Sequence, residues 1–287
     1  MTARSALLAW YVPRRRAYPW RGATDPYRVL VSEVMLQQTQ AARVAPAYRS
    51  FVRRFPTLRS LARASRAEVL RAWGTLGYNR RAVALAETAR IVVREHDGRL
   101  PRRPAELVRL PGIGPYTAAA VASLGYGAPV PAIDTNVRRV VARFRIGRDD
   151  AGAAEVAAAA GRWLDRRDPG AWNQALMDLG REVCRPAPRC HLCPLARTCR
   201  FRLTGAGPLR PVRRQAPYQG SFRQVRGAVV RVLRERSGAS VGDLAGRVGR
   251  PVEVVVRAVE RLSAEGLVRA GPAALTGRPS GWVRLAP

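Results

Sequence analysis

The chain has 287 residues, and its 51 basic side chains against 20 acidic ones give a formal net charge of +31 at pH 7. All the basic residues are arginines, since the sequence contains no lysine. This excludes every reaction that needs a side-chain Schiff base and leaves only the N-terminal amine for that role. The charge is spread along the chain, which favours nucleic acid as a partner, with strongly salt-dependent binding. The alternative is a solvated surface in a protein from an arginine-biased proteome.

The first predicted element is a helix at residues 6–12, whose apolar run is too short to span a membrane and leads directly into basic residues. We recognise no secretory signal ahead of it, so we expect a cytoplasmic, nucleoid-associated monomer without a membrane partner. Helical periodicity and alanine-rich segments dominate residues 1–203, with no convincing alternating strand pattern. The sequence therefore predicts a mainly α-helical protein.

A second helix is predicted to begin at Asp25, its N-cap, and to carry Glu33 in an otherwise apolar stretch. Burial there would raise the pKa of Glu33 enough for it to hold a proton near neutral pH. The polar residues at 37–39 follow one turn later, and their burial would be energetically unfavourable if that face of the helix were part of the core. A lone glutamate in a helix is more often solvated, so the catalytic interpretation needs a partner residue.

Residues 110–117 (Leu-Pro-Gly-Ile-Gly-Pro-Tyr-Thr) separate an apolar helix end from an alanine-rich helix. Gly112 and Gly114 permit a tight interhelical turn with exposed amides, and Pro115 suits the first turn of the second helix. Such a helix start binds phosphate through its backbone N–H groups and the helix dipole. A plain packing hairpin is the alternative, which the basic composition disfavours.

Asp134 is predicted to be a helix N-cap, whose carboxylate accepts backbone N–H bonds and therefore has a lowered pKa. Capping does not compete with a catalytic role. One carboxyl group kept protonated, as expected for Glu33, and one kept ionised is what cleavage of an N-glycosidic bond requires. The first is an acid for the leaving base, and the second is an anion for the oxocarbenium-like sugar.

All four cysteines lie within 16 residues, spaced Cys184-x5-Cys190-x2-Cys193-x5-Cys199, so we expect them to form one site. We interpret it as a [4Fe–4S] cluster site, because thiolates are the usual ligands and one compact loop supplies all four. Zinc is the alternative, although the two knuckles of a zinc ribbon are normally further apart. Disulfides are not expected, because no secretory signal is recognised and a chain of this length can bury a core without them.

Residues 204–220 are rich in Gly, Pro and Arg and are predicted to be a basic linker. A small domain at 221–287 follows, with predicted helices at 224–236, 241–248 and 252–266 and a hairpin-like end at 267–269 and 281–285. This order resembles a winged helix, whose third helix often enters the major groove of DNA. That helix carries Arg257 and Arg261 but also three glutamates, so a packing or protein-interaction module is the alternative.

These residues together resemble the helix-hairpin-helix DNA glycosylase superfamily with an iron–sulfur cluster, and within it the MutY-type adenine-DNA glycosylases. The resemblance covers about residues 5–203. Its motifs occur in the family's order at 19–21 (Pro-Trp-Arg), 32–40, 110–116, 134–136 (Asp-Thr-Asn), 173–175 (Asn-Gln-Ala) and the cysteine loop. It implies two lobes, a six-helix barrel at 23–128 and a cluster-bearing lobe built from 1–22 and 129–203, with DNA in the cleft between them.

The resemblance also implies roles for individual residues. Glu33 would protonate N7 of a flipped adenine, and Asp134 would stabilise or briefly trap the sugar cation, supported by Tyr116 and Asn136. The adenine pocket would be lined by Trp20, Arg21, Leu36 and Gln174. Further DNA contacts would come from Gln37, Gln38, Thr39, Leu76, Tyr78, Gly112, Gly114, Arg185 and Arg189. Of these, Gln38, Thr39, Leu76 and Tyr78 would face the orphaned opposite base.

The sequence departs from the family at three places. The first two cysteines are separated by five residues where six are usual, and Asn79 stands where a second tyrosine is common. The C-terminal part does not resemble the NUDIX-like domain through which typical members read 8-oxoguanine opposite adenine. These departures bear on the choice of substrate rather than on the chemistry.

Bifunctional relatives of the endonuclease III type place a catalytic lysine where Tyr116 stands, so base removal without strand cleavage is implied here. We therefore expect a monofunctional glycosylase that removes adenine opposite 8-oxoguanine or guanine. A thymine or uracil mismatch glycosylase of the same superfamily is the alternative. A non-catalytic, cluster-bearing DNA-binding module is a third possibility, which the presence of both Glu33 and Asp134 disfavours.

Overall fold

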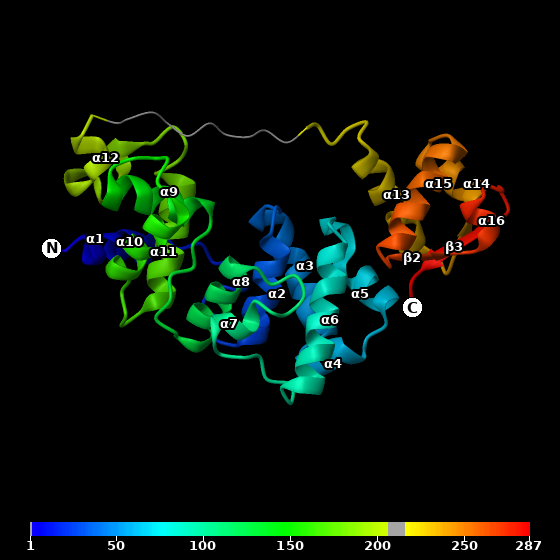
Figure 1. Cartoon of the computed structure of the whole chain (residues 1–287), viewed down its shortest axis with the longest axis horizontal. Coiled ribbons are helices and arrows are strands. Elements are labelled where there is room, and N and C mark those ends of the chain that lie inside the picture. Colours follow the sequence, from blue (N-terminus) through cyan, green and yellow to red (C-terminus); the bar gives the residue numbers. More distant parts are fainter. Residues whose placement is uncertain (1, 206–215) are drawn as a thin grey trace. The chain divides into compact units, whose positions relative to one another are not determined.

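The computed structural model describes residues 2–205 and 216–287, and most of this chain is helical (Figure 1). Its described residues form two compact units, the first from 2–34 and 100–205 and the second from 35–99 and 216–287. The predicted mainly α-helical class is confirmed. The predicted linker falls largely on 206–215, outside the described residues, and the predicted division into a barrel, a cluster lobe and a C-terminal domain stays a prediction. Over the described ranges, no helix combines the length and apolarity needed to cross a bilayer.

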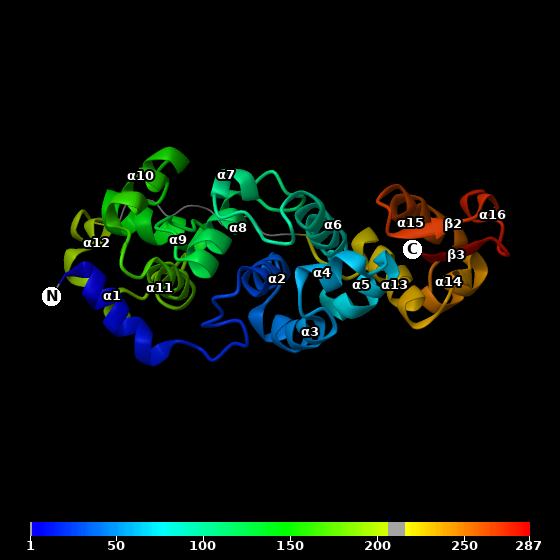
Figure 2. The same cartoon turned by 90° about the horizontal axis from the view of Figure 1, so that it is seen from below.

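The first unit is built of helices around one apolar core. Its helices are α1 (Ala3–Tyr11), α7 (Pro104–Leu107), α8 (Pro115–Ala120), α9 (Thr135–Val141), α10 (Ala153–Trp163), α11 (Pro169–Glu182) and α12 (Arg200–Leu203). Helix α2 (Pro26–Leu36) begins in this unit, and its last two residues belong to the second. Helix α1 lies beside α11 (Figure 2), and the core between them includes the fully buried Trp172, which makes an edge contact with Trp163.

Two glycines allow helices of the first unit to approach closely. A Cβ at Gly180 of α11 would lie 2.6 Å from Asn136 Cβ on α9, and one at Gly125 would lie 2.8 Å from Pro26 Cα at the start of α2. Atoms do not approach that closely, so a larger residue at either position would force the neighbouring segments to shift. Short π-helical turns at 121–125 and 142–146 continue α8 and α9.

Helices at 41–95 make up the first part of the second unit. They are α3 (Ala41–Arg54), α4 (Leu58–Arg63), α5 (Arg66–Trp73) and α6 (Arg80–Glu95). Capping boxes at Thr57 and Ser65 begin α4 and α5 by satisfying backbone N–H groups that a helix start leaves free. The interior is apolar, and the fully buried rings of Phe51 and Trp73 pack edge to face.

The C-terminal part of the second unit has the element order of a winged helix. Its elements are α13 (Phe222–Glu235), β1 (Ala239–Ser240), α14 (Val241–Val248), α15 (Val252–Ala264), β2 (Val268–Ala270), α16 (Pro272–Leu275) and β3 (Trp282–Leu285). The strands form an antiparallel sheet of order β1-β3-β2. The three predicted helices and the closing hairpin are confirmed to within a few residues, whereas β1 and α16 were not predicted. Both are too short to leave a periodic pattern.

This part packs against α5 through two arginines that donate to backbone carbonyls. Arg66 Nη1 donates to the carbonyl of Gly266, just after α15, at 3.0 Å, and Arg71 Nε donates to the carbonyl of Arg234, in the last turn of α13, at 3.3 Å. Because the last carbonyls of a helix have no partner within it, the second bond satisfies a group that would otherwise need water.

Gly180→Ala should lower the free energy of unfolding by about 1–3 kcal/mol, because the new methyl overlaps Asn136 and forces α9 and α11 apart. Gly161→Ala in α10 is the matched control. Its Cβ would meet no atom within 4 Å, and the loss of glycine from a helix interior should stabilise by about 0.5–1 kcal/mol. Urea denaturation followed by circular dichroism measures both, and equal effects would contradict the packing argument.

Candidate active site and cysteine loop

A buried glutamate and a tyrosine form the centre of the site in the first unit. Glu33, on α2, is 5% exposed, and its Oε2 accepts a hydrogen bond of 2.6 Å from the hydroxyl of Tyr116 on α8. Burial raises the pKa of Glu33 to about 7, although the Tyr116 bond lowers it and the neighbouring Asp134 charge raises it further. At neutral pH this carboxyl group therefore carries a proton for about half of the time. The burial and raised pKa expected from the sequence are both found.

Asp134 caps α9 as expected. Its Oδ1 accepts from the backbone N–H groups of Asn136 at 2.9 Å and Val137 at 2.7 Å, and its Oδ2 accepts from the side-chain amide of Asn136 at 2.9 Å. The expected lowering of its pKa is wrong, because burial raises the pKa and outweighs these bonds and the charge of Arg139. The cap geometry was visible in the sequence, whereas the desolvation comes from the folded surroundings.

A hydrogen-bonded chain leads from Asp134 to the cysteine loop. Arg139 Nη2 donates to Asn136 Oδ1 at 2.8 Å and to the carbonyl of Gly180 at 2.7 Å, while its Nε donates to the carbonyl of Cys184 at 2.6 Å. Asn136 is thus held by Arg139 on one side while it donates to Asp134 on the other. Arg139 was not predicted from the sequence, because two of its three acceptors lie more than 40 residues away.

Arg21 and Gln174 lie together beside an acid that sequence analysis missed. Arg21 forms an ion pair with the buried Asp178 at 2.7 Å and donates to Gln174 Oε1 at 3.1 Å and to Tyr11 Oη at 2.7 Å. Tyr11 in turn donates to the same Gln174 oxygen at 2.7 Å. The Gln174 carbonyl is therefore occupied, which fixes the orientation of its amide. Asp178 stands four residues after Gln174, so both side chains lie on the same face of α11.

Two further residues support this site. Trp20 is buried and stacks on Tyr18 with ring centroids 5.0 Å apart. Asn173 is fully buried, and its amide joins three segments. Its Nδ2 donates to Ser123 Oγ at 2.8 Å and to the carbonyl of Val130 at 3.0 Å, and its Oδ1 accepts from the N–H of Ala132. Asn173 thereby fixes the loop that leads into Asp134.

The polar run after α2 is organised within the second unit by Arg81 of α6. Its guanidinium donates to the carbonyls of Met35 at 2.9 Å and Gln37 at 2.5 Å, and to Thr39 Oγ1 at 3.0 Å. Burial lowers the pKa of Arg81 to about 10. The segment at 37–39 is a tight turn in which Gln38 has φ +55°. Sequence analysis did not single out Arg81, one arginine among many.

The remaining predicted contacts differ in exposure. Tyr78 is 43% exposed with φ +48°, and its ring lies over the Arg81 guanidinium, whereas Leu76 is buried. Leu36 is partly buried at the end of α2. Gly112 adopts φ +74°, which favours glycine, and a Cβ at Gly114 would meet no described atom within 4 Å. The backbone before α8 is therefore open to a ligand. The predicted DNA-binding roles of all these residues stay predictions.

The cysteine loop follows α11 and is held by a buried arginine. Arg143 forms an ion pair with Asp149 at 2.8 Å and donates to the carbonyls of Arg185 at 2.6 Å and Pro186 at 3.0 Å. Its guanidinium also lies 3.8 Å from Cys184 Sγ. Arg185 itself is exposed, as is Arg189, so both remain candidates for DNA contact.

The four cysteines are free, partly buried thiols. Burial raises the pKa of Cys184 and Cys199, and that of Cys193 to about 12. Thiols in such surroundings stay protonated at neutral pH unless a cation replaces their protons. Over residues 2–205 and 216–287, no three His, Cys, Asp or Glu side chains converge closely enough to hold one metal ion. The ligands of a four-iron cluster bind separate iron atoms, so they need not converge on one point.

Comparisons with known proteins agree with these features. Residues 31–166 match the family described as HhH-GPD superfamily base excision DNA repair protein. An adenine DNA glycosylase of Mycobacterium tuberculosis (strain H37Rv) is 49% identical over 235 residues, which are 79% of this chain and 77% of that protein. The adenine DNA glycosylase of Homo sapiens is 42% identical over 213 residues, which are 69% of this chain and 39% of that protein.

Solved structures give the same superfamily. A thermostable thymine-DNA glycosylase matches with a TM-score of 0.66 at 29% identity, covering 70% of this chain and 95% of that one. A non-covalent endonuclease III–DNA complex matches with a TM-score of 0.59 at 24% identity, covering 71% of this chain and 98% of that one, and supports the fold alone. The chain belongs to the HhH-GPD superfamily of base excision DNA repair proteins, in the family of adenine DNA glycosylases. The resemblance seen in the sequence motifs is thereby confirmed.

Glu33 should make stability depend on pH. Its folded pKa of about 7 lies above the ordinary 4.5, so the folded chain keeps a proton that the unfolded chain releases. The free energy of unfolding should therefore fall as pH rises through this window. Glu33→Gln abolishes the titration and keeps an oxygen for Tyr116. The free energy of unfolding of the variant, relative to that of the wild type, should therefore increase between about pH 5 and about pH 8. At 1.36 kcal/mol per pKa unit, this increase should be up to about 3 kcal/mol.

Urea denaturation at several pH values measures this difference. Glu106→Gln in α7 is the control, because Glu106 is exposed in the same unit and its replacement should give no comparable growth. A constant difference between Glu33→Gln and wild type across this range would contradict the burial of an ionisable carboxyl group.

Proposed function

We propose that the chain is a monofunctional DNA glycosylase that hydrolyses the N-glycosidic bond of adenine opposite 8-oxoguanine or guanine. The observation that carries this proposal is the pair of carboxyl groups in the first unit, the buried Glu33 that accepts from Tyr116 and the partly buried Asp134 that accepts from Asn136. The adenine DNA glycosylases among its relatives support the choice of base. Double-stranded DNA is the proposed partner, which the net charge of +31 supports, and the active form is proposed to be the monomer.

Glu33 is the proposed general acid. Departure of adenine leaves an electron pair on the base, and a proton from Glu33 at N7 neutralises it as the bond to the sugar breaks. A general acid is most effective when its pKa lies near the operating pH, and burial places the pKa of Glu33 at about 7. The Tyr116 hydroxyl fixes the carboxyl group by donating to Oε2.

Asp134 is the proposed anion for the sugar cation. Three hydrogen bonds fix its carboxylate, so no reorganisation is needed when positive charge develops at C1′. Water then adds its hydroxyl to C1′ and releases one proton, which leaves an abasic site and free adenine. In this scheme Asn136 and Arg139 position Asp134 and do not touch the substrate.

The proposed base pocket is formed by Trp20, Arg21, Leu36 and Gln174. Because the Gln174 carbonyl already accepts from Tyr11 and Arg21, its amide N–H groups are the part left to meet acceptors on a base. Specificity for the opposite base is assigned to the turns at 37–39 and 76–78, where Tyr78 is exposed. These roles rest on the family resemblance.

Monofunctional chemistry follows from the lack of lysine. A lyase step needs an amine to form an imine with the sugar, and Tyr116 supplies a hydroxyl instead. A thymine mismatch glycosylase is the second candidate, favoured by the 29% identity to a thymine-DNA glycosylase of known structure. The two candidates differ in which base is released, and they share the acid and the anion.

Single-turnover excision on duplexes that present A, T or U opposite G or 8-oxoguanine tests the proposal. Adenine should be released at the highest rate, and the DNA should remain unbroken until alkali is added. The rate should fall as pH rises through about 7, where Glu33 loses its proton, and also at low pH as Asp134 becomes protonated. Faster release of thymine than of adenine would favour the second candidate, a thymine mismatch glycosylase. The absence of release from every duplex would indicate a non-catalytic DNA-binding module.

Glu33→Gln should slow excision by roughly 10²–10⁴-fold, because it keeps the shape and removes the proton. Asp134→Asn should slow it by a comparable or larger factor. Both variants should still bind the duplex, and neither they nor the wild type should be trapped on DNA by borohydride. Near wild-type excision by Glu33→Gln would remove Glu33 from the mechanism, and efficient trapping would point to the N-terminal amine.

We further propose that Cys184, Cys190, Cys193 and Cys199 hold a [4Fe–4S] cluster. The four thiols in one loop are the donors such a cluster takes, and the nearby Arg143 offsets part of its negative charge. The bound cluster would act as a cross-link that fixes the loop after α11. Purified protein should contain about four iron atoms per chain, and Cys193→Ala should lose most of them. Stoichiometric zinc without iron after anaerobic purification would replace the cluster by a zinc site.

A further inference from the structure

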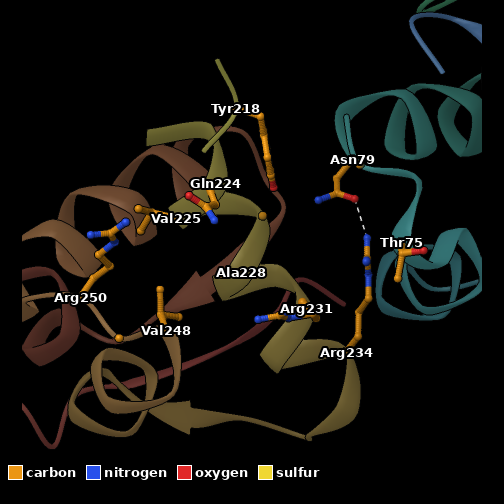
Figure 3. Close-up of a pocket in the computed structure, with 13 residues that line it drawn as sticks. Thr75, Asn79, Tyr218, Gln224, Val225, Ala228, Arg231, Arg234, Val248 and Arg250 are labelled. Atoms are coloured by element: carbon orange, nitrogen blue, oxygen red, sulfur yellow. Dashed lines mark hydrogen bonds between the residues drawn. The ribbon is translucent and has the colours of Figure 1, made fainter. Parts of the chain in front are cut away.

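A pocket of about 560 Å³ lies within the second unit, between α13 and the segment at 75–79 (Figure 3). Arg231 and Arg234 extend into it from α13, Arg250 follows α14, and Thr75 and Asn79 form the facing wall. Its described lining carries three guanidinium groups and no carboxylate. This pocket belongs to none of the sites described above.

The cations of this pocket lack anionic partners. Arg234 donates to the neutral side-chain oxygen of Asn79 at 2.5 Å, and its buried Nε has no hydrogen-bond partner among the described residues. Burial lowers the pKa of Arg234 to about 10. The side chains of Arg231 and Arg250 form no hydrogen bond or ion pair with any residue at 2–205 or 216–287. Arg231 and Arg250 are exposed, whereas Arg234 is partly buried. A guanidinium partly removed from water without an anion is unfavourable, and two further cations with free donors lie beside it, so the pocket is complementary to a negatively charged ligand.

A neighbouring hollow shows the contrast. It also has three arginines, Arg231, Arg236 and Arg247, but Glu235 lines it too. Asp243 binds Arg247 at 3.0 Å and lies 3.8 Å from Arg236. There the charges are largely balanced within the chain. The exposed face of α15 is balanced in the same way, since Arg257 and Arg261 alternate with Glu253 and Glu260.

We infer that the pocket binds the phosphodiester backbone of DNA, so that the C-terminal part contacts DNA through α13 rather than through α15. Guanidinium groups bind phosphate oxygens in bidentate fashion, and the three arginines offer several N–H donors to successive phosphates. The ligand is taken to be a polymer because the same segment carries the exposed Tyr78 and because the whole chain is strongly basic. This inference rests on the proposed DNA substrate, and it adds a backbone contact that confers no base specificity.

The test compares two double variants of the full chain that lose equal charge from the same C-terminal part. Arg231→Ala with Arg250→Ala removes the two pocket cations that hold no other group in place, and Arg257→Ala with Arg261→Ala is the matched control on α15. Duplex affinity is measured at several salt concentrations for A opposite 8-oxoguanine, A opposite G, and undamaged DNA. Thermal unfolding of both variants should match that of the wild type.

The pocket variant should bind all three duplexes about 10- to 100-fold more weakly at ~0.1 M salt, and its slope of log affinity against log salt should be smaller by about 2. The α15 variant should stay within about threefold of wild type. Arg231→Lys with Arg250→Lys should recover most of the slope, because it restores the charge. The rate of adenine release with enzyme saturating the DNA should be unchanged in every variant.

Three results would overturn the inference. Equal losses in the two variants would show a general effect of net charge. A loss confined to one opposite base would make the pocket a base reader. Thermal stabilisation of wild type, but not of the pocket variant, by millimolar inorganic phosphate with unchanged DNA affinity would make the ligand a free anion. Failure of the proposed function is a separate result, namely absence of adenine release by the wild type.

Discussion

The burial of Glu33 and the partial burial of Asp134 in one helical unit are the constraint on which the site depends. Moving a carboxylate out of water is unfavourable by several kcal/mol unless fixed donors take the place of the water. Tyr116 supplies a donor to Glu33, and Asn136 supplies two to Asp134. The Tyr116 hydroxyl reaches Glu33 only when α8 and α2 pack closely, which Gly125 permits at the start of α2, whereas the donors to Asp134 lie in the helix that it caps. The electrostatics of the site therefore depend on how the helices of the first unit pack.

Sequence analysis succeeded where the cause of a feature is local. The Asp134 cap depends on backbone N–H groups two and three residues ahead, and the C-terminal helices depend on apolar periodicity within each segment. The burial of Glu33 could also be expected, because its neighbours along α2 are apolar. Resemblance to a family extended these local predictions to the site as a whole. For these features a short stretch of sequence contains most of the physical information.

Features that depend on distant segments could not be predicted. Asp134 keeps its cap, but the desolvation that raises its pKa comes from residues packed around it, so the expected direction was wrong. Asp178 pairs with Arg21 across 157 positions, and Arg81 reaches back to Gln37 across 44. No periodic pattern in the sequence predicts which arginine will be buried among carbonyl groups. Such partners become visible only once helices from separate parts of the chain are packed together.

The arginines therefore serve two purposes, which the net charge alone does not distinguish. Some join segments of the chain, and others have donors available to a ligand. Arg81, Arg139 and Arg143 use the planar, five-donor guanidinium to join several carbonyl groups of different segments, which the ammonium of lysine cannot match in geometry. Carbonyl groups accept from these arginines, so they hold segments together in addition to adding to the field around the protein. Arg231 and Arg250 have unoccupied donors at a hollow surface. The proposed phosphate contact is therefore distinguished by free guanidinium donors that gather in one hollow, since a charge of +31 spread along the chain marks no face at all.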